Sequence, residues 1–266
     1  MSTDARRGVA PDSRQTSRIV ALIPARYGSS RFPGKALADL CGKPLIAHVY
    51  ERTRLARGVD DVIVATDDQR IADAVAAFGG TVRMTQGGHR TGTDRIAEVA
   101  RDLACEIVVN PQGDEPLLEP RMIEDVVRPL LDDPTVLMTT LRRPITDPAD
   151  YVSPHVVKVT VDARGDALYF SRAPIPAAGA PGAGPALPPC HAHIGLYAFR
   201  RDFLLRFAAL PQTPLERIES LEQLRALEHG YRIRTVATPH ATVGVDTPED
   251  LERAREHLLA GTREGA

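Results

Sequence analysis

Charged side chains follow several apolar segments that are predicted to be strands. Arg26 and Lys35 stand in the loop IPARYGSSRFPGK, after the first of these segments. Asp114 and Glu115 follow the segment IVVN, and Asp246 follows the segment VGV. Ligands of open α/β sheets bind beyond the carboxyl ends of the strands, so these side chains are expected to meet at one site. Cations there would hold the phosphates of a nucleotide, and carboxylates would hold Mg²⁺ that bridges phosphate oxygens.

The glycines of this loop fit neither of two common phosphate-binding patterns. Gly28 and Gly34 have five residues between them instead of four, and Lys35 is followed by Ala36 instead of Ser or Thr. No G-x-G-x-x-G can be placed over the loop, which disfavours an NAD-dependent dehydrogenase. Both glycines would still let backbone N–H groups approach phosphates. Taken alone, the loop is more typical of a solvated turn and the acids of turn or helix-cap residues, but their shared place beyond strand ends favours a site.

The composition is that of an ordinary globular protein. The chain has 266 residues, of which 43% are hydrophobic and 26% are charged, enough for a substantial core. Its formal net charge of −2 gives no reason to expect a nucleic acid or a membrane as a partner. No apolar run approaches the roughly 18 residues of a membrane span. A nucleotide site must therefore be basic locally.

The N-terminal segment and the cysteines indicate a cytoplasmic protein. Residues 1–17 are polar and lack the apolar core of a signal peptide, and we expect them to form a disordered tail. Cys41, Cys105 and Cys190 are odd in number and far apart, which is not the spacing of a disulfide framework or a zinc knuckle. A reduced cytoplasm fits this cysteine usage best.

Strand-like and helix-like segments alternate in the first half of the chain. Apolar, β-branched runs predict strands at 18–25, 61–67, 81–85 and from residue 106 to Pro111. Helical spacing predicts helices at 44–57 with Pro44 in the first turn, from Asp67 or Asp68 to Phe78, and at 91–103 after a capping Thr. The alternation implies a mostly parallel sheet with helices on both faces.

The second half of the chain has a different sequence pattern. Its patterns predict a hairpin at 155–172, a mobile Pro/Gly/Ala-rich loop at 174–189, a strand at 193–200, one amphipathic helix at 214–230 ended by Gly230, a strand at 232–238 and a capped helix at 247–258. No repeat and no long linker divides the chain. We therefore predict one α/β domain over 18–266, with a mixed, mainly parallel sheet flanked by helices and a smaller antiparallel subregion at about 150–200.

Motifs from residue 18 to residue 258 resemble those of a known enzyme family. IPARYGSSRFPGKALADLCGKPLIAHVYER, GTDRIAEV, VVNPQGDEPLL, ALYFSRAPIP, HIGLYAFR, LEQLRALEHG and GVDTPEDLERA are similar, in this order, to the motifs of the 3-deoxy-manno-octulosonate cytidylyltransferases. The resemblance implies a Rossmann-like nucleotidyltransferase that moves CMP from CTP to the anomeric 2-hydroxyl of 3-deoxy-D-manno-octulosonate (Kdo). CMP-Kdo and pyrophosphate would be the products, made for lipopolysaccharide biosynthesis. A homodimer formed through the antiparallel subregion is also implied.

The resemblance also implies roles for single residues. Nucleotide binding is implied for Arg26, Gly28, Ser29, Lys35, Thr93 and Arg95. Catalysis is implied for Arg26, Lys35, Asp114 and Asp246, the two acids being the ligands of the Mg²⁺ cofactor. Sugar binding is implied for Gln112, Arg172, His193, Tyr197, Glu222 and Gln223, with Arg172 on the Kdo carboxylate. Because phosphoryl-type transfer depends on positioning and charge, we expect direct in-line displacement with one or two metal ions.

Other interpretations of these residues stay open at this point. Tyr197 is equally typical of a strand core, and Glu222 and Gln223 are typical of a solvated helix face. The segment CHAH, with two histidines on one strand face, suggests zinc only weakly because further ligands are missing. The nearest rival function is the same chemistry on a sialate or an 8-amino Kdo analogue. A catalytically inactive nucleotide-binding protein of the same fold is disfavoured by the presence of both Asp114 and Asp246.

Overall fold

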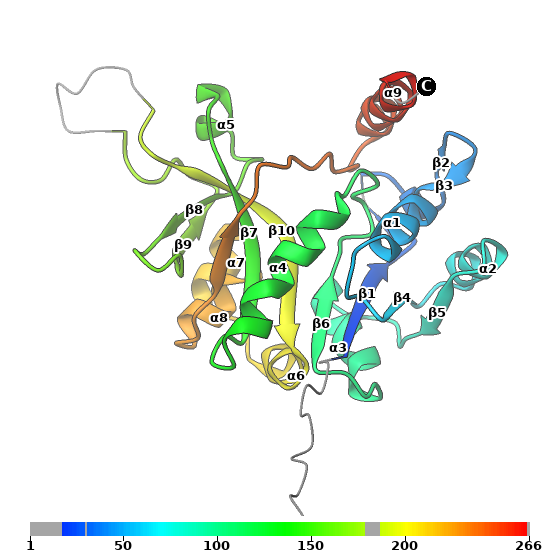
Figure 1. Cartoon of the computed structure of the whole chain (residues 1–266), viewed down its shortest axis with the longest axis horizontal. Coiled ribbons are helices and arrows are strands. Elements are labelled where there is room, and N and C mark those ends of the chain that lie inside the picture. Colours follow the sequence, from blue (N-terminus) through cyan, green and yellow to red (C-terminus); the bar gives the residue numbers. More distant parts are fainter. Residues whose placement is uncertain (1–17, 30, 179–186, 265–266) are drawn as a thin grey trace, which may run out of the picture.

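One mixed sheet of nine strands organises the described part of the protein (Figure 1). The computed structural model describes residues 18–29, 31–178 and 187–264, so the predicted tail 1–17 and half of the predicted mobile loop lie outside the described residues. The strand order is β11-β7-β10-β6-β1-β4-β5, with β8 pairing with β10 and β9 with β8. The strands are β1 (Ile19–Ala25), β4 (Asp61–Thr66), β5 (Thr81–Met84), β6 (Ile107–Asn110), β7 (Met138–Pro144), β8 (Lys158–Val161), β9 (Ala167–Ser171), β10 (His191–Arg200) and β11 (Arg234–Ala237).

The sheet has a parallel half and a half built around an antiparallel strand. β1 pairs in parallel with both β4 and β6, and β4 pairs in parallel with β5. β10 then runs antiparallel between β6 and β7, and β11 pairs in parallel with β7. The hairpin of β8 and β9, predicted at 155–172, extends this half through β10. The predicted fold class, a mixed and mainly parallel sheet flanked by helices, is therefore confirmed.

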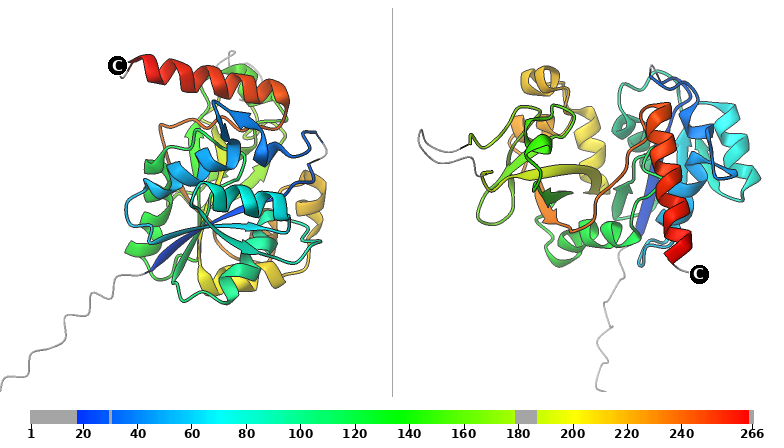
Figure 2. Two further views of the ribbon diagram at one scale, coloured as in Figure 1. Left: turned by 90° about the vertical axis from the view of Figure 1, so that its right-hand side faces the viewer. Right: turned by 90° about the horizontal axis from the view of Figure 1, so that it is seen from above.

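Helices cover both faces of the sheet, as Figure 2 shows. One face carries α1 (Leu45–Arg54), α2 (Gln69–Ala77), α4 (Pro120–Asp132) and α9 (Pro248–Glu264). The other face carries α3 (Gly92–Arg101), α6 (Arg201–Ala209), α7 (Pro214–Glu219) and α8 (Leu224–Glu228). Side chains of β1 alternate between the two cores: Ile19, Ala21 and Ile23 pack on the first face, Val20 and Leu22 on the second. A strand buried on both faces is apolar throughout, which explains the sequence IVALIPA.

Short elements complete the chain. A 3₁₀ turn, η1 (Lys35–Leu37), follows the loop after β1, and β2 (Asp39–Leu40) pairs with β3 (Lys43–Pro44) to form a separate two-stranded sheet. The short helix α5 (Pro148–Val152) contributes Tyr151 to a small apolar cluster near the start of β10. No helix of the described residues is both long and apolar enough to cross a membrane.

The predicted helix caps are confirmed, with one exception. The Asp68 carboxylate accepts from the backbone N–H of Arg70 at the start of α2, and the Thr91 hydroxyl accepts from the N–H of Asp94 in α3. Each cap satisfies a backbone donor that the helix itself leaves without a partner. Pro44, predicted to lie in the first turn of α1, is instead the residue before that helix, with an extended backbone.

The prediction of a single helix over 214–230 is wrong. The chain forms α7, breaks at Ser220, and resumes as α8 before Gly230. Ser220 has a φ of 53°, in the left-handed region that ends a helix. The neighbouring Glu219 carboxylate accepts from the hydroxyl of Ser171, the last residue of β9, and from the backbone N–H of the next residue, Arg172. These contacts between distant segments, which the local helical pattern does not reveal, stabilise the break.

The prediction that Asp246 follows a strand of the sheet is also wrong. Residues 241–246 form neither strand nor helix. This segment is held instead by a backbone hydrogen bond of 2.9 Å from the Val245 N–H to the carbonyl of Asp114. The bond places Asp246 beside the end of β6, where the strand prediction would also have placed it.

Candidate active site

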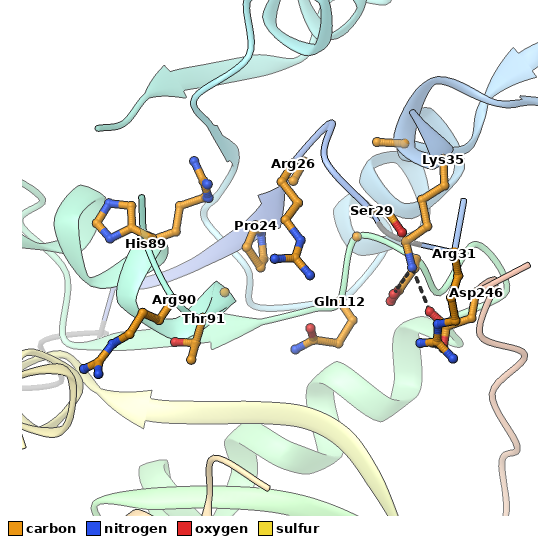
Figure 3. A pocket seen from close by; sticks show the side chains of 16 residues that line it. Pro24, Arg26, Ser29, Arg31, Lys35, His89, Arg90, Thr91, Gln112 and Asp246 are labelled. Carbon is orange, nitrogen blue, oxygen red and sulfur yellow. Dashed lines mark hydrogen bonds and ion pairs between the residues drawn. The ribbon is translucent and has the colours of Figure 1, made fainter. Parts of the chain in front are cut away.

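A basic cleft of about 270 Å³ lies beyond the carboxyl ends of β1 and β6 (Figure 3). Its lining comes from the loop after β1, the turn after β6, the start of α3 and the segment before α9. Seven of the residues singled out in the sequence line it: Arg26, Ser29, Lys35, Arg95, Gln112, Asp114 and Asp246. The parallel strands bring these loops together because their carboxyl ends share one edge of the sheet.

Lys35 is the centre of the charged groups in this cleft. Its ammonium nitrogen lies 2.6 Å from Oδ2 of Asp114 and 3.0 Å from Oδ1 of Asp246, and it donates to the carbonyl of Val245 at 3.0 Å. Burial alone would lower the pKa of Lys35, but the two carboxylates raise it above its ordinary value. Lys35 is therefore fully charged at neutral pH and holds two acids from distant parts of the chain side by side.

Two glycines fix the backbone around this cluster. Gly34 has a φ of 74°, and its N–H donates to the carbonyl of Tyr27 at 2.9 Å, which closes the loop before Lys35. A side chain at Gly34 would also press on the Tyr27 ring. At Gly113, a Cβ would come within 2.7 Å of the carbonyl oxygen of Pro24. The turn that presents Asp114 can thus lie directly against the end of β1 only because residue 113 is glycine.

Positive charge exceeds negative charge in the cleft. Five cationic side chains, those of Arg26, Arg31, Lys35, Arg90 and Arg95, line it together with the carboxylates of Asp114 and Asp246. Figure 3 shows Arg26 extending from the end of β1 into the cleft. Arg26 is exposed and has no ion-pair partner in the part of the chain that the structure describes. The N-terminus of α3 also faces the cleft, and a helix N-terminus favours anions. The arrangement suits a polyanion such as a triphosphate.

Two further cations of the cleft, Arg31 and Arg95, are paired with acids. Arg31 contacts Oδ2 of Asp246 at 2.9 Å, and the almost fully buried Arg95 lies 3.0 Å from Oδ2 of Asp67. Arg95 also donates to the hydroxyl of Thr85 at 2.6 Å. The contacts of the buried Arg95 hold its guanidinium group in a fixed position at the wall of the cleft.

Residues predicted to bind the sugar lie beside the cleft, on β10 and at the break between α7 and α8. Gln112 lines the cleft and donates its amide N–H to the carbonyl of Gly195 in β10 at 3.1 Å. The rings of His193 and Tyr197 lie 5.5 Å apart on β10. Burial raises the pKa of Tyr197 well above its ordinary value, and the nearby charge of Glu222 adds to this.

Glu222 connects this region to the start of α3. Its two carboxylate oxygens accept from the hydroxyls of Thr91 and Thr93 at 2.7 and 2.8 Å. Burial raises the pKa of Glu222, against the lowering effect of the two threonine hydroxyls. Thr93 is itself almost fully buried, so its hydroxyl serves this contact.

Seven predicted site residues do not line the cleft: Thr93, His193, Tyr197 and Glu222, described above, and Gly28, Gln223 and Arg172. Gly28 is exposed in the loop after β1, and the buried side chain of Gln223 has an amide nitrogen without a partner among the described residues. Arg172 lies at the end of β9, where its guanidinium donates to the carbonyls of Glu219 and Pro154 at 2.9 and 3.1 Å. The binding roles of all the predicted site residues stay predictions.

The cleft contains residues that sequence reasoning missed. Arg31, His89, Arg90 and Thr91 all line it. Arg31 stands between the two glycines of the loop already chosen, and Thr91 begins the TGTDR segment, so both carried a local signal. His89 and Arg90 precede the cap of α3 in a segment without a pattern of its own.

The acids of the cleft fit a magnesium ion that is shared with a substrate. No cluster of three or more His, Cys, Asp or Glu side chains suited to a metal occurs among the described residues. Asp114 and Asp246, both in contact with one ammonium group, are a pair of carboxylates that a cation already holds together. Mg²⁺ is commonly bound by one or two carboxylates plus substrate phosphates.

The sheet and its cleft define a nucleotidyltransferase with a Rossmann-like fold. A solved 4-diphosphocytidyl-2C-methyl-D-erythritol synthase from Anaerococcus prevotii shares this fold, with a TM-score of 0.60 over 92% of this chain and 100% of its own, at 13% identity. The cytidylyltransferase family pattern matches residues 20–233.

Similarity to particular relatives narrows this class. A 3-deoxy-manno-octulosonate cytidylyltransferase of Syntrophotalea carbinolica is 57% identical over 90% of this chain and 98% of its own, and one of Geobacter sulfurreducens is 55% identical over 90% and 99%. A solved CMP:2-keto-3-deoxy-manno-octonic acid synthetase complexed with CTP is 46% identical, with a TM-score of 0.86 over 92% of this chain and 100% of its own. The chain belongs to the 3-deoxy-manno-octulosonate cytidylyltransferase family.

Proposed function

We propose that the protein transfers CMP from CTP to the anomeric 2-hydroxyl of Kdo and releases pyrophosphate. The observation that carries this proposal is the basic cleft in which Lys35 holds Asp114 and Asp246 together, in a chain of this family. Such a cleft can bind the triphosphate of CTP and leave its α-phosphorus open to a nucleophile. The product CMP-Kdo serves lipopolysaccharide biosynthesis.

The chain's own cations offset the electrostatic repulsion between the two substrates. Kdo is an anion and CTP is a polyanion, so the two repel each other at the distance that bond formation requires. Arg26 and Lys35 offset this repulsion and then stabilise the charge that develops on the leaving pyrophosphate. The 2-hydroxyl attacks the α-phosphorus, the bond to the pyrophosphate oxygen breaks, and no covalent enzyme intermediate forms. Positioning and charge supply the catalysis.

Asp114 and Asp246 would hold Mg²⁺ together with phosphate oxygens of the nucleotide. The bound ion would neutralise phosphate charge and lower the pKa of the attacking hydroxyl, so that no dedicated protein base is needed. Lys35, which contacts both acids, keeps the two carboxylates close to each other before the ion and CTP arrive.

Kdo would bind between the cleft and β10. Gln112, His193, Tyr197 and Glu222 offer hydrogen bonds to its hydroxyls, and Arg172 is proposed for its carboxylate. Support comes from the contacts of Gln112 with β10 and of Glu222 with the start of α3, which join the sugar side to the nucleotide side. The protein is further proposed to act in the cytoplasm as a homodimer.

Pyrophosphate release from the purified protein tests this function. With Mg²⁺ and CTP, release is expected with Kdo but not with N-acetylneuraminate or without a sugar. Asp114→Asn and Asp246→Asn should abolish it. Asp61→Asn is the matched control because this carboxylate pairs with Arg18 and is half exposed at the start of β4. Release with N-acetylneuraminate and not with Kdo would make a sialate the substrate. If neither sugar acid causes release, the proposal is refuted.

A further inference from the structure

A buried threonine on β7 contacts three groups of β10. Thr140 has no exposed surface, and its hydroxyl oxygen lies 2.9 Å from Nε2 of His193. The same oxygen lies 3.1 Å from the carbonyl oxygen of Ile194 and 3.0 Å from that of Leu196. The hydroxyl therefore sits where a side chain and two backbone groups of β10 converge.

This convergence coincides with an irregularity in β10. The strand pairs with β7 from His191 to Ile194, and pairing resumes only at Tyr197, so residues 195 and 196 have no partner on β7. Gly195, inside this bulge, uses its carbonyl to accept from the Gln112 amide. Bulges commonly redirect side chains next to active sites. Here the bulge lies between His193 and Tyr197 in the chain and supplies an acceptor for a cleft residue.

The number of protons available around Thr140 determines which group donates in its hydrogen bond with His193. A hydroxyl has one proton to donate, and carbonyl oxygens can only accept. If Thr140 gives its proton to Ile194 or Leu196, the contact with His193 is a hydrogen bond only when Nε2 carries a hydrogen and donates it. If Thr140 donated to His193 instead, both carbonyls would lose this donor. The arrangement that makes more bonds has His193 protonated on Nε2 and leaves a lone pair on Nδ1.

We propose that Thr140 is a positioning residue that holds His193 in its Nε2-protonated tautomer, so that Nδ1 accepts a hydrogen bond from a hydroxyl of the sugar. The sugar part of this inference rests on the proposed function. Thr140 does not touch the substrate. It acts through the imidazole and through the bulge that also binds Gln112.

The surroundings of the ring support this assignment. Phe170 packs edge-on against His193 with ring centres 4.9 Å apart, and Tyr197 contacts it from β10. Withdrawal from water lowers the pKa of His193 to about 3, so the ring is neutral under ordinary conditions. A neutral ring with a free lone pair accepts from a hydroxyl and repels a carboxylate. The acid group of the sugar must then bind elsewhere, which is consistent with the role proposed for Arg172.

Neighbouring positions on β7 provide matched variants. Thr140→Val removes the hydroxyl at nearly constant shape, and Thr140→Ser keeps it. Thr139→Val is the control, because Thr139 is equally buried on the same strand but donates to the carbonyl of Val126 on the opposite face, at 2.6 Å. All three variants change one buried strand residue, so a general loss of stability would affect them alike.

Two measurements on the full-length protein test the inference. Long-range ¹H–¹⁵N spectra of the substrate-free protein report the tautomer of His193, and His193→Gln assigns its signals. We expect Nε2 protonation in the wild type and in Thr139→Val, and loss of this single tautomer in Thr140→Val. The KM for Kdo should rise about tenfold in Thr140→Val, as for the loss of one hydrogen bond, while the KM for CTP stays unchanged. Thr140→Ser, which keeps the hydroxyl, should match the wild type in both the His193 tautomer and the KM for Kdo.

Opposite results would overturn the inference at defined points. Nδ1 protonation of His193 in the wild type would contradict the tautomer. Equal KM values for Kdo in Thr140→Val and Thr139→Val would contradict the positioning role. If the folded protein shows the predicted tautomer but does not turn over Kdo, the proposed function is refuted. The assignment of the Thr140–His193 hydrogen bond would still hold.

Discussion

The ammonium group of Lys35 lies 2.6 Å from a carboxylate oxygen of Asp114, although 79 positions separate the two residues in the chain. β1 and β6 are parallel neighbours, with Val20 opposite Val108, so the loops after them begin side by side. One loop supplies the cation and the other the acid. The sheet topology thus brings the pair together, and Asp246 joins it through the contact of Val245 with Asp114.

Replacement of Lys35 by Met should lower kcat/KM by about 100-fold or more. The change removes a cation aimed at the phosphates, and losses of this size are typical of a lost electrostatic contact in an active site. It also leaves two neighbouring carboxylates without their common counter-charge. Pyrophosphate release under kcat/KM conditions measures the effect.

Lys43→Met is the control for this experiment. Lys43 pairs with Glu51 at 2.8 Å, and both side chains are about half exposed, so its loss should change the rate by no more than about twofold. Near-normal turnover by Lys35→Met would show that the charge of Lys35 is dispensable and that Arg26 alone serves the phosphates.

Gly113→Ala should destabilise the protein by about 1–3 kcal/mol, the usual cost of forcing extra atoms into a packed site. The new Cβ would stand 2.7 Å from the backbone oxygen of Pro24, and neither segment can move without shifting β1 or Asp114. The thermal midpoint should fall by roughly 2–4 °C for each kcal/mol. Gly244→Ala, where a Cβ meets open space, should not lower it. Equal midpoints for the two variants would contradict the close contact.

Local patterns predicted the parallel half of the fold and missed parts of the rest. Strand and helix signals alternate up to β6, and two of the three helices there, α2 and α3, begin with a capping side chain. α4, which was not predicted, has apolar side chains at helical spacing and a proline at its start, but its internal Pro129 is unusual in a helix. β7 reads MTTLRRP, and its two arginines obscure a strand whose first half is buried.

The candidate site was predictable where chemistry and strand ends coincided. The cluster of Lys35, Asp114 and Asp246 was expected from residue type and position, and the structure brings the three together. The contacts of Glu222 with Thr91 and Thr93 were not predictable, because they depend on the break at Ser220. That break is stabilised by long-range contacts, which no local pattern encodes.

Arg225→Met should lower the free energy of unfolding by about 3–5 kcal/mol, because it leaves Glu216 buried without its partner. Arg225 has no exposed side-chain surface and donates to Glu216 through two nitrogens, at 2.9 and 2.5 Å. Adding Glu216→Gln should recover part of the loss, since the unpaired charge disappears. Urea unfolding measures all three proteins.

An exposed pair provides the comparison for this prediction. Arg121 lies 3.3 Å from Glu124 on the surface of α4 and is more than half exposed, so Arg121→Met should cost less than about 1 kcal/mol. If Arg225→Met cost no more than Arg121→Met, or if the double variant were less stable than the single one, burial of the charge pair would not matter as argued.

The pH dependence of stability should change in His193→Gln. The pKa of His193 is lowered to about 3 in the folded protein from an ordinary value of 6.5. Between these values the unfolded chain binds the proton and the folded protein does not, so the free energy of unfolding falls as the pH falls through this window. One such group contributes a slope of up to about 1.4 kcal/mol for each pH unit. His193→Gln, which cannot take up the proton, should flatten the decline between about pH 7 and about pH 5 in urea unfolding.

His155→Gln, at an exposed position, should keep the wild-type slope. A slope that is equally steep in His193→Gln would mean that the imidazole is protonated as easily in the folded protein as in the unfolded chain, and the neutral ring that contacts Thr140 would then be untenable.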